Sequence, residues 1–253
     1  MSRPKTQDVP DLSALLVPQN DLMLAVERAV LRGRETSQLA SLAEQIAAKL
    51  AGVITLDLVH AGQRLLEQDI SHVLHVSRAP VREALRILER DRLVEFQPRR
   101  GALVTAPDAT DLRDVYSVRS ALYAMLLQQV MGERPADLEA VFDAHMPQVT
   151  EAAQDSVDAY AVATFLLNFA IADLSSNRLL ADLLQSISLR TLRYVRLGLA
   201  SNPAAMPAFA KSWCDLHEAV AKRDSDLVVE IAKQRISEIR DTAVLALDVP
   251  QDS

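Results

Sequence analysis

The chain has 253 residues, of which 49% are hydrophobic and 24% charged, a balance typical of a soluble globular protein with a full-sized core. No apolar run approaches the roughly 20 residues that cross a membrane, and the first residues lack the apolar segment of a secretory signal. The single cysteine, Cys214, excludes an internal disulfide, so a cytoplasmic location is expected.

The net charge of −7 is unevenly distributed along the chain. Residues 1–110 hold 14 basic and 14 acidic residues, whereas residues 111–253 hold 13 and 20. Between Ser77 and Gly101 there are seven arginines and four acids. A local positive patch matters more for nucleic-acid binding than the overall sum, so the global charge does not exclude DNA.

The first 40 residues form an N-terminal extension. Residues 1–19 are polar and contain proline, which predicts a mobile arm. Residues 21–31 form either a short helix or a segment that orders only on a partner. Ser41, with Glu44 three residues on, matches a capping box, and apolar residues recur behind it at helical spacing.

Two short helices and a hairpin are predicted next. The first helix covers residues 67–74, and Ser77 is expected to cap a second one that has Pro80 in its first turn. In the second helix three arginines repeat every four residues opposite the apolar face. Residues 93–96 and 102–104 are predicted strands, joined by a loop with a proline, two arginines and a glycine.

From Pro107 onward the pattern is helical. The expected helices cover residues 108–131, 135–151, 155–174, 177–198, 203–222 and 224–246. The predicted fold class is therefore mainly α: a winged helix-turn-helix with a small β-hairpin wing, followed by an all-helical bundle. The expected divisions are an extension (1–40), a DNA-binding domain (41–106), an effector and dimerisation domain (107–246) and a tail (247–253).

The second short helix carries the residue types of a DNA-recognition helix. Arginine can donate two hydrogen bonds to guanine in the major groove, and a helix N-terminus with a hydroxyl suits phosphate. An arginine face on a solvated helix is the alternative. The fixed order of capped turn, arginine stripe and basic hairpin within 30 residues favours DNA. The candidate DNA-binding residues are Ser77, Arg78, Arg82, Arg99, Arg100 and Gly101.

Residues 76–85, VSRAPVREAL, resemble the signature V-S-R-T-P-V-R-E-A-L of GntR-family regulators, and residues 98–104, PRRGALV, resemble their wing. The resemblance implies that Ser77, Arg78, Arg82 and the wing at Gly101 touch DNA. Two positions depart from the family. His75 replaces a glycine, which would cost free energy if the turn is left-handed, and Ala79 replaces a threonine that could contact phosphate.

The helical part resembles the FCD effector domain of the FadR branch, through residues 111–122 and 172–180. Most members of that branch bind a divalent metal through one aspartate and three histidines. By this alignment Thr164, Asn168, Trp213 and Arg235 stand at those four positions. None is a strong metal donor, so the resemblance implies no metal site and no cofactor here.

The substitutions instead suggest a metal-free pocket for an apolar or aromatic organic acid. The candidate effector-binding residues are Arg119, Asn168, Trp213, His217 and Arg235. Trp213 would fill the old metal cavity or stack on a flat ligand, and Arg235 could pair with a carboxylate. His217 is either a polar anchor for the effector or a partly exposed helix residue. A filled cavity that senses nothing is the alternative to a pocket.

These patterns predict a one-component transcription regulator, a repressor that binds a palindromic operator as a homodimer and responds to a small organic acid or apolar metabolite. The alternative is a dimeric architectural or interaction protein that has lost effector sensing. No arrangement of nucleophile, base and acid at catalytic spacing is present, so an enzyme is not expected. His72 and His75 are interpreted as exposed or phosphate-proximal rather than as metal ligands.

Overall fold

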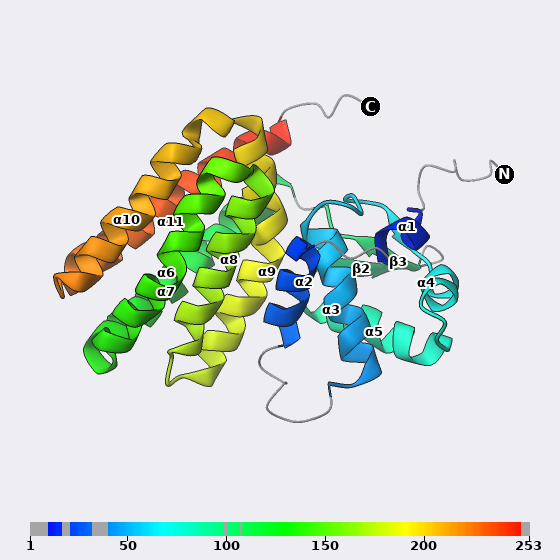
Figure 1. Cartoon of the computed structure of the whole chain (residues 1–253). Coiled ribbons are helices and arrows are strands. Elements are labelled where there is room, and N and C mark those ends of the chain that lie inside the picture. Colours follow the sequence, from blue (N-terminus) through cyan, green and yellow to red (C-terminus); the bar gives the residue numbers. More distant parts are fainter. Residues whose placement is uncertain (1–9, 17–20, 32–39, 99–100, 107, 249–253) are drawn as a thin grey trace. The chain divides into compact units, whose positions relative to one another are not determined.

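The structure, a computed structural model, describes residues 10–16, 21–31, 40–98, 101–106 and 108–248. The chain divides into two compact units, Met1–Ala106 and Pro107–Ser253. Figure 1 shows helices with a small sheet in the first unit and helices alone in the second. The chain thus has the mainly helical fold class that the sequence predicts.

The first unit is a winged helix-turn-helix. Its three helices are α3 (Leu42–Thr55), α4 (Glu67–Val73) and α5 (Arg78–Arg90), with α5 packed against both others. The sheet has the order β1-β3-β2 and is antiparallel, with β1 (Arg64–Leu65), β2 (Val94–Gln97) and β3 (Gly101–Val104). The hairpin β2–β3 is the predicted wing, whereas β1 was not predicted because two residues carry no alternation of polarity.

Two helices that precede this domain belong to the same core. Helices α1 (Leu12–Leu16) and α2 (Asp21–Leu31) pack against α3, and α1 also contacts α4. Leu12, Leu16 and Val26 are almost completely buried. The arm expected over residues 1–19 therefore contains a buried helix, and residues 21–31 take the helical alternative. α3 is apolar on two faces because α2 covers one and α5 the other.

Local signals in the first unit explain where its helices begin. The Ser41 side chain accepts from the Glu44 backbone N–H while the Glu44 carboxylate accepts from the Ser41 N–H, the predicted capping box. Ser77 occupies the N-cap position of α5, but its hydroxyl makes no capping hydrogen bond, which corrects the prediction that it caps the helix. His75 has φ 53°, so the turn is left-handed at the position where the family has glycine.

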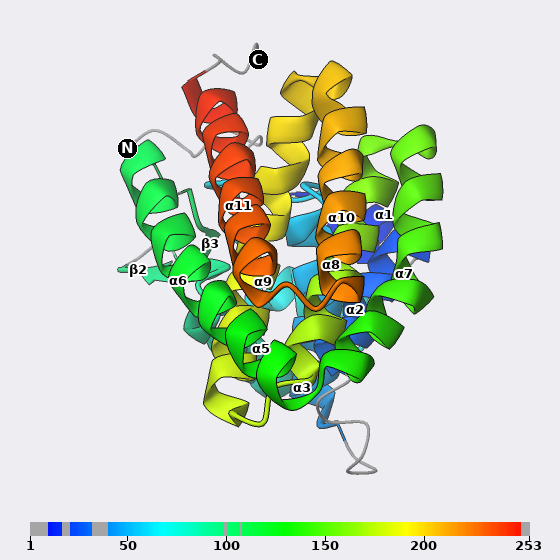
Figure 2. The same ribbon diagram turned by 90° about the vertical axis from the view of Figure 1, so that its left-hand side faces the viewer.

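The second unit is a helical bundle (Figure 2). Its neighbours in space include the pairs α6–α11, α8–α9, α7–α8, α9–α11, α7–α10 and α10–α11. Five of its six helices begin within two residues of the predicted first residue. Helix α10 begins three residues later than predicted, after a short 3-10 turn at 203–205. The helices are α6 (Ala109–Glu133), α7 (Pro135–Asp155), α8 (Val157–Asp173), α9 (Arg178–Ser201), α10 (Met206–Ala221) and α11 (Ser225–Asp248).

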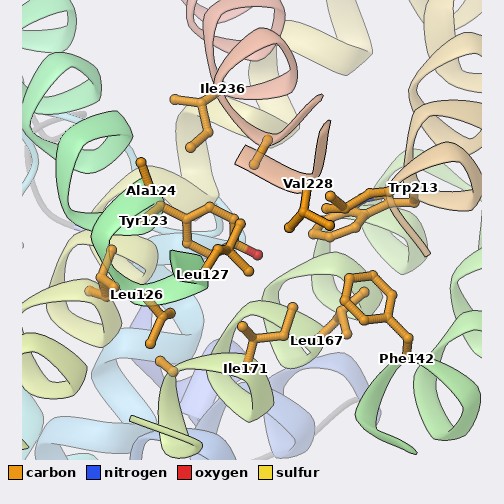
Figure 3. Packing of buried hydrophobic residues seen from close by; sticks show 14 of the residues in the cluster. Tyr123, Ala124, Leu126, Leu127, Phe142, Leu167, Ile171, Trp213, Val228 and Ile236 are labelled. Atoms are coloured by element: carbon orange, nitrogen blue, oxygen red, sulfur yellow. The ribbon is translucent and has the colours of Figure 1, made fainter. Parts of the chain in front are cut away.

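The bundle core is made of aliphatic and aromatic side chains from all of these helices (Figure 3). Helix α8 is buried almost all round, as its apolar sequence predicts. Helices α9 and α11 approach closely at Gly198, where an added Cβ would lie 3.0 Å from the backbone of α11. None of the described helices is long and apolar enough to cross a membrane.

Candidate DNA-binding surface and effector cavity

The start of α5 presents a hydroxyl and an arginine to solvent. Ser77 and Arg78 are both exposed. Neither side chain makes a hydrogen bond or ion pair with another residue that the structure describes. Both lie at the positive end of the helix dipole, where an anion is stabilised. This end of α5 can therefore accept a phosphate group.

Arg82 and Arg86 lie one and two turns further along α5, and each has a different partner. Arg82 donates from Nε and Nη2 to the two carboxylate oxygens of Glu67 on α4, over 2.9 and 2.8 Å. Arg86 donates from Nη1 to Glu89 over 2.7 Å, and its guanidinium lies 4.2 Å from the ring centroid of Phe96 in β2. The predicted arginine stripe is exposed, but its members are held in different directions.

The second strand of the wing, β3, begins at Gly101, which has φ 79°. Only glycine adopts that conformation without strain. An added Cβ there would lie 3.9 Å from the guanidinium of Arg64 in β1. Sequence reasoning did not single out Arg64, since it is separated from the wing by 37 residues. The expected contacts of Arg99 and Arg100 lie outside the described residues.

One partly open cavity is formed by the helices of the bundle. Four of its lining residues come from the positions that the family resemblance assigned to metal ligands: Thr164, Asn168, Trp213 and Arg235. These residues come from helices α8, α10 and α11, so the fold brings together side chains up to 71 positions apart in sequence. The other lining residues are Arg119, Tyr123, Tyr160, Val195, Phe209, Ala232, Ile236 and Ile239.

Two guanidinium groups face this cavity. Arg119 is buried and donates to the Thr191 hydroxyl over 2.6 Å. Arg235 donates to the carbonyl oxygen of Phe209 over 3.2 Å and to the Ser212 hydroxyl. Burial lowers the pKa of both arginines, because a charged group loses its hydration. No aspartate or glutamate is among the described lining residues, so the cavity is cationic.

Two tyrosines complete the polar lining, and sequence reasoning missed both. The Tyr123 hydroxyl is buried without a hydrogen-bond partner among the described residues. Tyr123 and Tyr160 each have their pKa raised to about 12 by burial, so both are neutral donors at neutral pH. Figure 3 shows Tyr123 and Trp213 among the buried side chains on either side of Val228. No local pattern marks these tyrosines, because only the fold places them beside Arg119 and Arg235.

His217 is not part of the cavity lining, contrary to its expected role as an effector anchor. Its ring stacks on Phe142 with 5.3 Å between centroids, and Nε2 lies 3.0 Å from an Asp143 carboxylate oxygen. Both partners belong to α7. His217 lies about one turn after Trp213 on the same face of α10, and both rings contact Phe142 of α7, but only Trp213 reaches the cavity.

The donors in the cavity do not suit a divalent cation. Thr164 and Asn168 offer a hydroxyl and an amide that bond to their own helix, and the remaining groups are an indole, phenols and two cations. Zinc, nickel and manganese prefer imidazole and carboxylate ligands. Among the described residues, no group of three or more His, Cys, Asp or Glu could hold a metal ion.

A winged helix-turn-helix joined to a helical unit that carries a ligand-sized pocket is the arrangement of a DNA-binding transcription regulator. The model of the bacterial regulatory proteins of the gntR family matches residues 42–104, and that of the FCD domain matches residues 114–238. The chain belongs to the GntR family and carries an FCD effector-binding domain.

Curated relatives agree with this assignment. The chain is 26% identical to the HTH-type regulator YdhC of Bacillus subtilis over 50% of its own length and 58% of that protein's. It is 36% identical to the HTH-type regulator BphR of Paraburkholderia xenovorans, and 32% identical to the gluconate operon transcriptional repressor of Bacillus subtilis. These two matches span 40% and 36% of this chain, and 41% and 37% of the relatives.

Solved structures show the same fold. A putative GntR regulator from Rhodococcus sp. RHA1 has a TM-score of 0.70 at 24% identity, covering 81% of this chain and 98% of that one. McbR/YncC of E. coli has a TM-score of 0.69 at 20% identity, covering 83% and 98%. At these identities the similarity establishes the fold.

Proposed function

We propose that the chain is a repressor whose recognition helix α5 reads an operator, and whose bundle releases the DNA when an organic anion binds. The DNA contacts would come from Ser77, Arg78, Arg82 and the wing from Arg99 to Gly101. The exposed start of α5, with an unused hydroxyl and a cation at its positive end, is the observation that supports this role. Repression rather than activation is supported by one relative, which is named as the gluconate operon transcriptional repressor.

The test measures, by fluorescence anisotropy, how tightly the purified protein binds the promoter region beside its own gene. Arg82→Ala should weaken operator binding by about 1–3 kcal/mol per half-site, the size of a lost bidentate base contact. Arg90→Ala is the matched control, since Arg90 is exposed in the last turn of the same helix. Equal, salt-labile binding to operator and unrelated DNA would instead support the architectural alternative.

We infer that the protein dimerises through α6 and α9. Val118 and Met125 on α6, with Leu179 and Leu183 on α9, are large exposed apolar residues. Each pair is spaced to lie on one face of its helix. The two helices run side by side: Arg119 of α6 bonds to Thr191 of α9, and Gln129 of α6 bonds to Ser176, two residues before α9 begins. A second copy of this chain is the occupant that a two-fold symmetric operator requires.

Light scattering on a size-exclusion column tests the dimer. Met125→Glu should shift the protein toward monomer, since a charge would be buried in a dimer contact. Leu245→Glu, at a residue 65% exposed on α11, is the control and should leave the mass unchanged. A dimer that persists in Met125→Glu would contradict the assigned face.

The proposed effector is a small apolar or aromatic carboxylate. Arg119 is buried and Arg235 partly buried, and the described lining of their cavity holds no carboxylate, so an anion bound there would offset their charge. The indole of Trp213 and the aliphatic lining would hold the apolar part of such a ligand. The amide of Asn168, which also lines the cavity, would form a hydrogen bond with the ligand.

Titration calorimetry with benzoate, and with benzamide as the neutral analogue of the same shape, tests this class of ligand. Benzoate should bind and lower operator affinity, whereas benzamide should do neither. Binding of both compounds with equal affinity would remove the role of charge. A stoichiometric divalent metal in elemental analysis of the purified protein would contradict the metal-free pocket.

A further inference from the structure

The ion pair between Glu67 and Arg82 fixes which edge of the arginine is exposed. A guanidinium has five N–H donors in two usable edges: a side edge from Nε and Nη2, and an end edge from Nη1 and Nη2. Glu67 accepts two hydrogen bonds from the side edge, at 2.9 and 2.8 Å. The Arg82 side chain is nevertheless 62% exposed, and its Nη1 makes no hydrogen bond with another described residue, so the end edge is not occupied. That edge has the paired donors that guanine O6 and N7 accept.

Glu67 is itself held in place. It is the first residue of α4, so its carboxylate lies at the positive end of that helix. Its side chain is 26% exposed, and the hydrogen bond from Arg82 lowers its pKa below the ordinary value, which favours the charged carboxylate. The pair therefore links the two helices of the helix-turn-helix through a charged, two-bond contact that has a defined plane.

The neighbouring arginines lack this arrangement. Arg86 uses Nη1, a donor of its end edge, to bond Glu89, and its guanidinium lies over Phe96. Arg78 makes no hydrogen bond or ion pair with another described residue, and its charge only adds to the electrostatic attraction on Glu67, so no such contact sets the plane of its guanidinium. Of the three arginines on this face of α5, Arg82 alone presents a fixed, unoccupied end edge.

We propose that Glu67 is a positioning residue for sequence recognition: it orients Arg82 so that the end edge of the guanidinium meets a guanine. The inference rests on the proposed DNA-reading function of Arg82. An arginine held in its binding geometry before DNA arrives loses less side-chain freedom on binding. It also discriminates more sharply, because it cannot swing to a neighbouring phosphate. Glu67 thus contributes to specificity without touching DNA.

The test compares Glu67→Gln with Glu89→Gln. Both variants remove one negative charge from a carboxylate that pairs with an arginine of α5, so both raise general attraction to phosphate. The wild-type protein first selects its preferred duplex from a random DNA library. The guanine whose preference Arg82→Ala loses is then replaced by adenine, and affinities for both duplexes are measured by anisotropy with each variant.

Glu67→Gln should lower the guanine-over-adenine preference by roughly fivefold or more, the lower end of a bidentate base contact. Glu89→Gln should keep that preference. In an Arg82→Lys background the Glu67→Gln change should have no further effect on it, since lysine has no edge to orient. Melting temperatures of all variants show whether the fold is kept.

Three outcomes would overturn the inference, and they can be told apart. If Arg82→Ala changes no base preference, the proposed reading role of Arg82 fails. If Arg82→Ala changes the base preference but Glu67→Gln keeps it, as Glu89→Gln does, then Arg82 reads DNA without help from Glu67. If Glu67→Gln weakens binding to every duplex equally and lowers the melting temperature, the ion pair acts only on the fold.

Discussion

The guanidinium carbon of Arg235 lies 3.7 Å from the centroid of the Trp213 ring. The cation on α11 thus stacks on the indole of α10 at the wall of the cavity. Trp213 is the one tryptophan of the chain, so its fluorescence reports on this contact without background from another indole.

Benzoate should change the Trp213 emission, and Arg235→Met should abolish both the change and the binding. The reason is that the carboxylate needs the guanidinium, while methionine keeps the apolar volume but has no charge. Fluorescence titration measures both effects. Arg196→Met is the control, because Arg196 is paired with Asp158 through two hydrogen bonds and does not line the cavity. An unchanged benzoate response in Arg235→Met would exclude Arg235 from the site.

His75→Gly should stabilise the protein by about 0.5–1 kcal/mol. His75 has φ 53°, and a side chain in that left-handed conformation is strained where glycine is not. Urea unfolding followed by circular dichroism measures the change. His72→Gly provides the contrast, since His72 lies within helix α4 and its replacement should destabilise by a similar amount. Equal effects of the two substitutions would refute the argument from backbone strain.

Gly198→Ala should destabilise the helical bundle by about 1–3 kcal/mol, the usual cost of overpacking. The added methyl group would lie 3.0 Å from backbone atoms of Thr242 and Ala243, which cannot move independently of α11. Gly132→Ala, also in a helix but with open space around the new Cβ, should be neutral or stabilising. Thermal unfolding measures the stability of both variants. An unchanged stability of Gly198→Ala would mean that the α9–α11 contact is looser than described.

Alkaline pH should unfold the bundle as its tyrosines ionise. Burial raises the pKa of Tyr116, Tyr123 and Tyr160 to about 12, against an ordinary value of 10.0. The folded state therefore holds these protons more tightly than the unfolded state. The resulting stability is fully present below pH 10 and is lost as the pH rises through 12. The near-ultraviolet absorbance of tyrosinate should rise later in native than in denatured protein; coincident titrations would contradict the burial.

The sequence by itself determined the helix-turn-helix, the wing and the six bundle helices, because those features depend on local periodicity, caps and turn residues. The capping box at Ser41 is an example. It also predicted that Thr164, Asn168, Trp213 and Arg235 replace a set of metal ligands, and the fold brings all four to one cavity.

Only the tertiary structure decided what these side chains contact. The first helix, Leu12–Leu16, is too short for its sequence to show a helical period. Its apolar side is buried because the helix packs on α3 and α4. The direction of His217 toward Phe142, the tyrosines beside Arg119 and Arg235, and the bond from Arg82 to Glu67 all join residues far apart in sequence or on different helices. Such contacts depend on how helices are rotated against one another, which no single helix encodes.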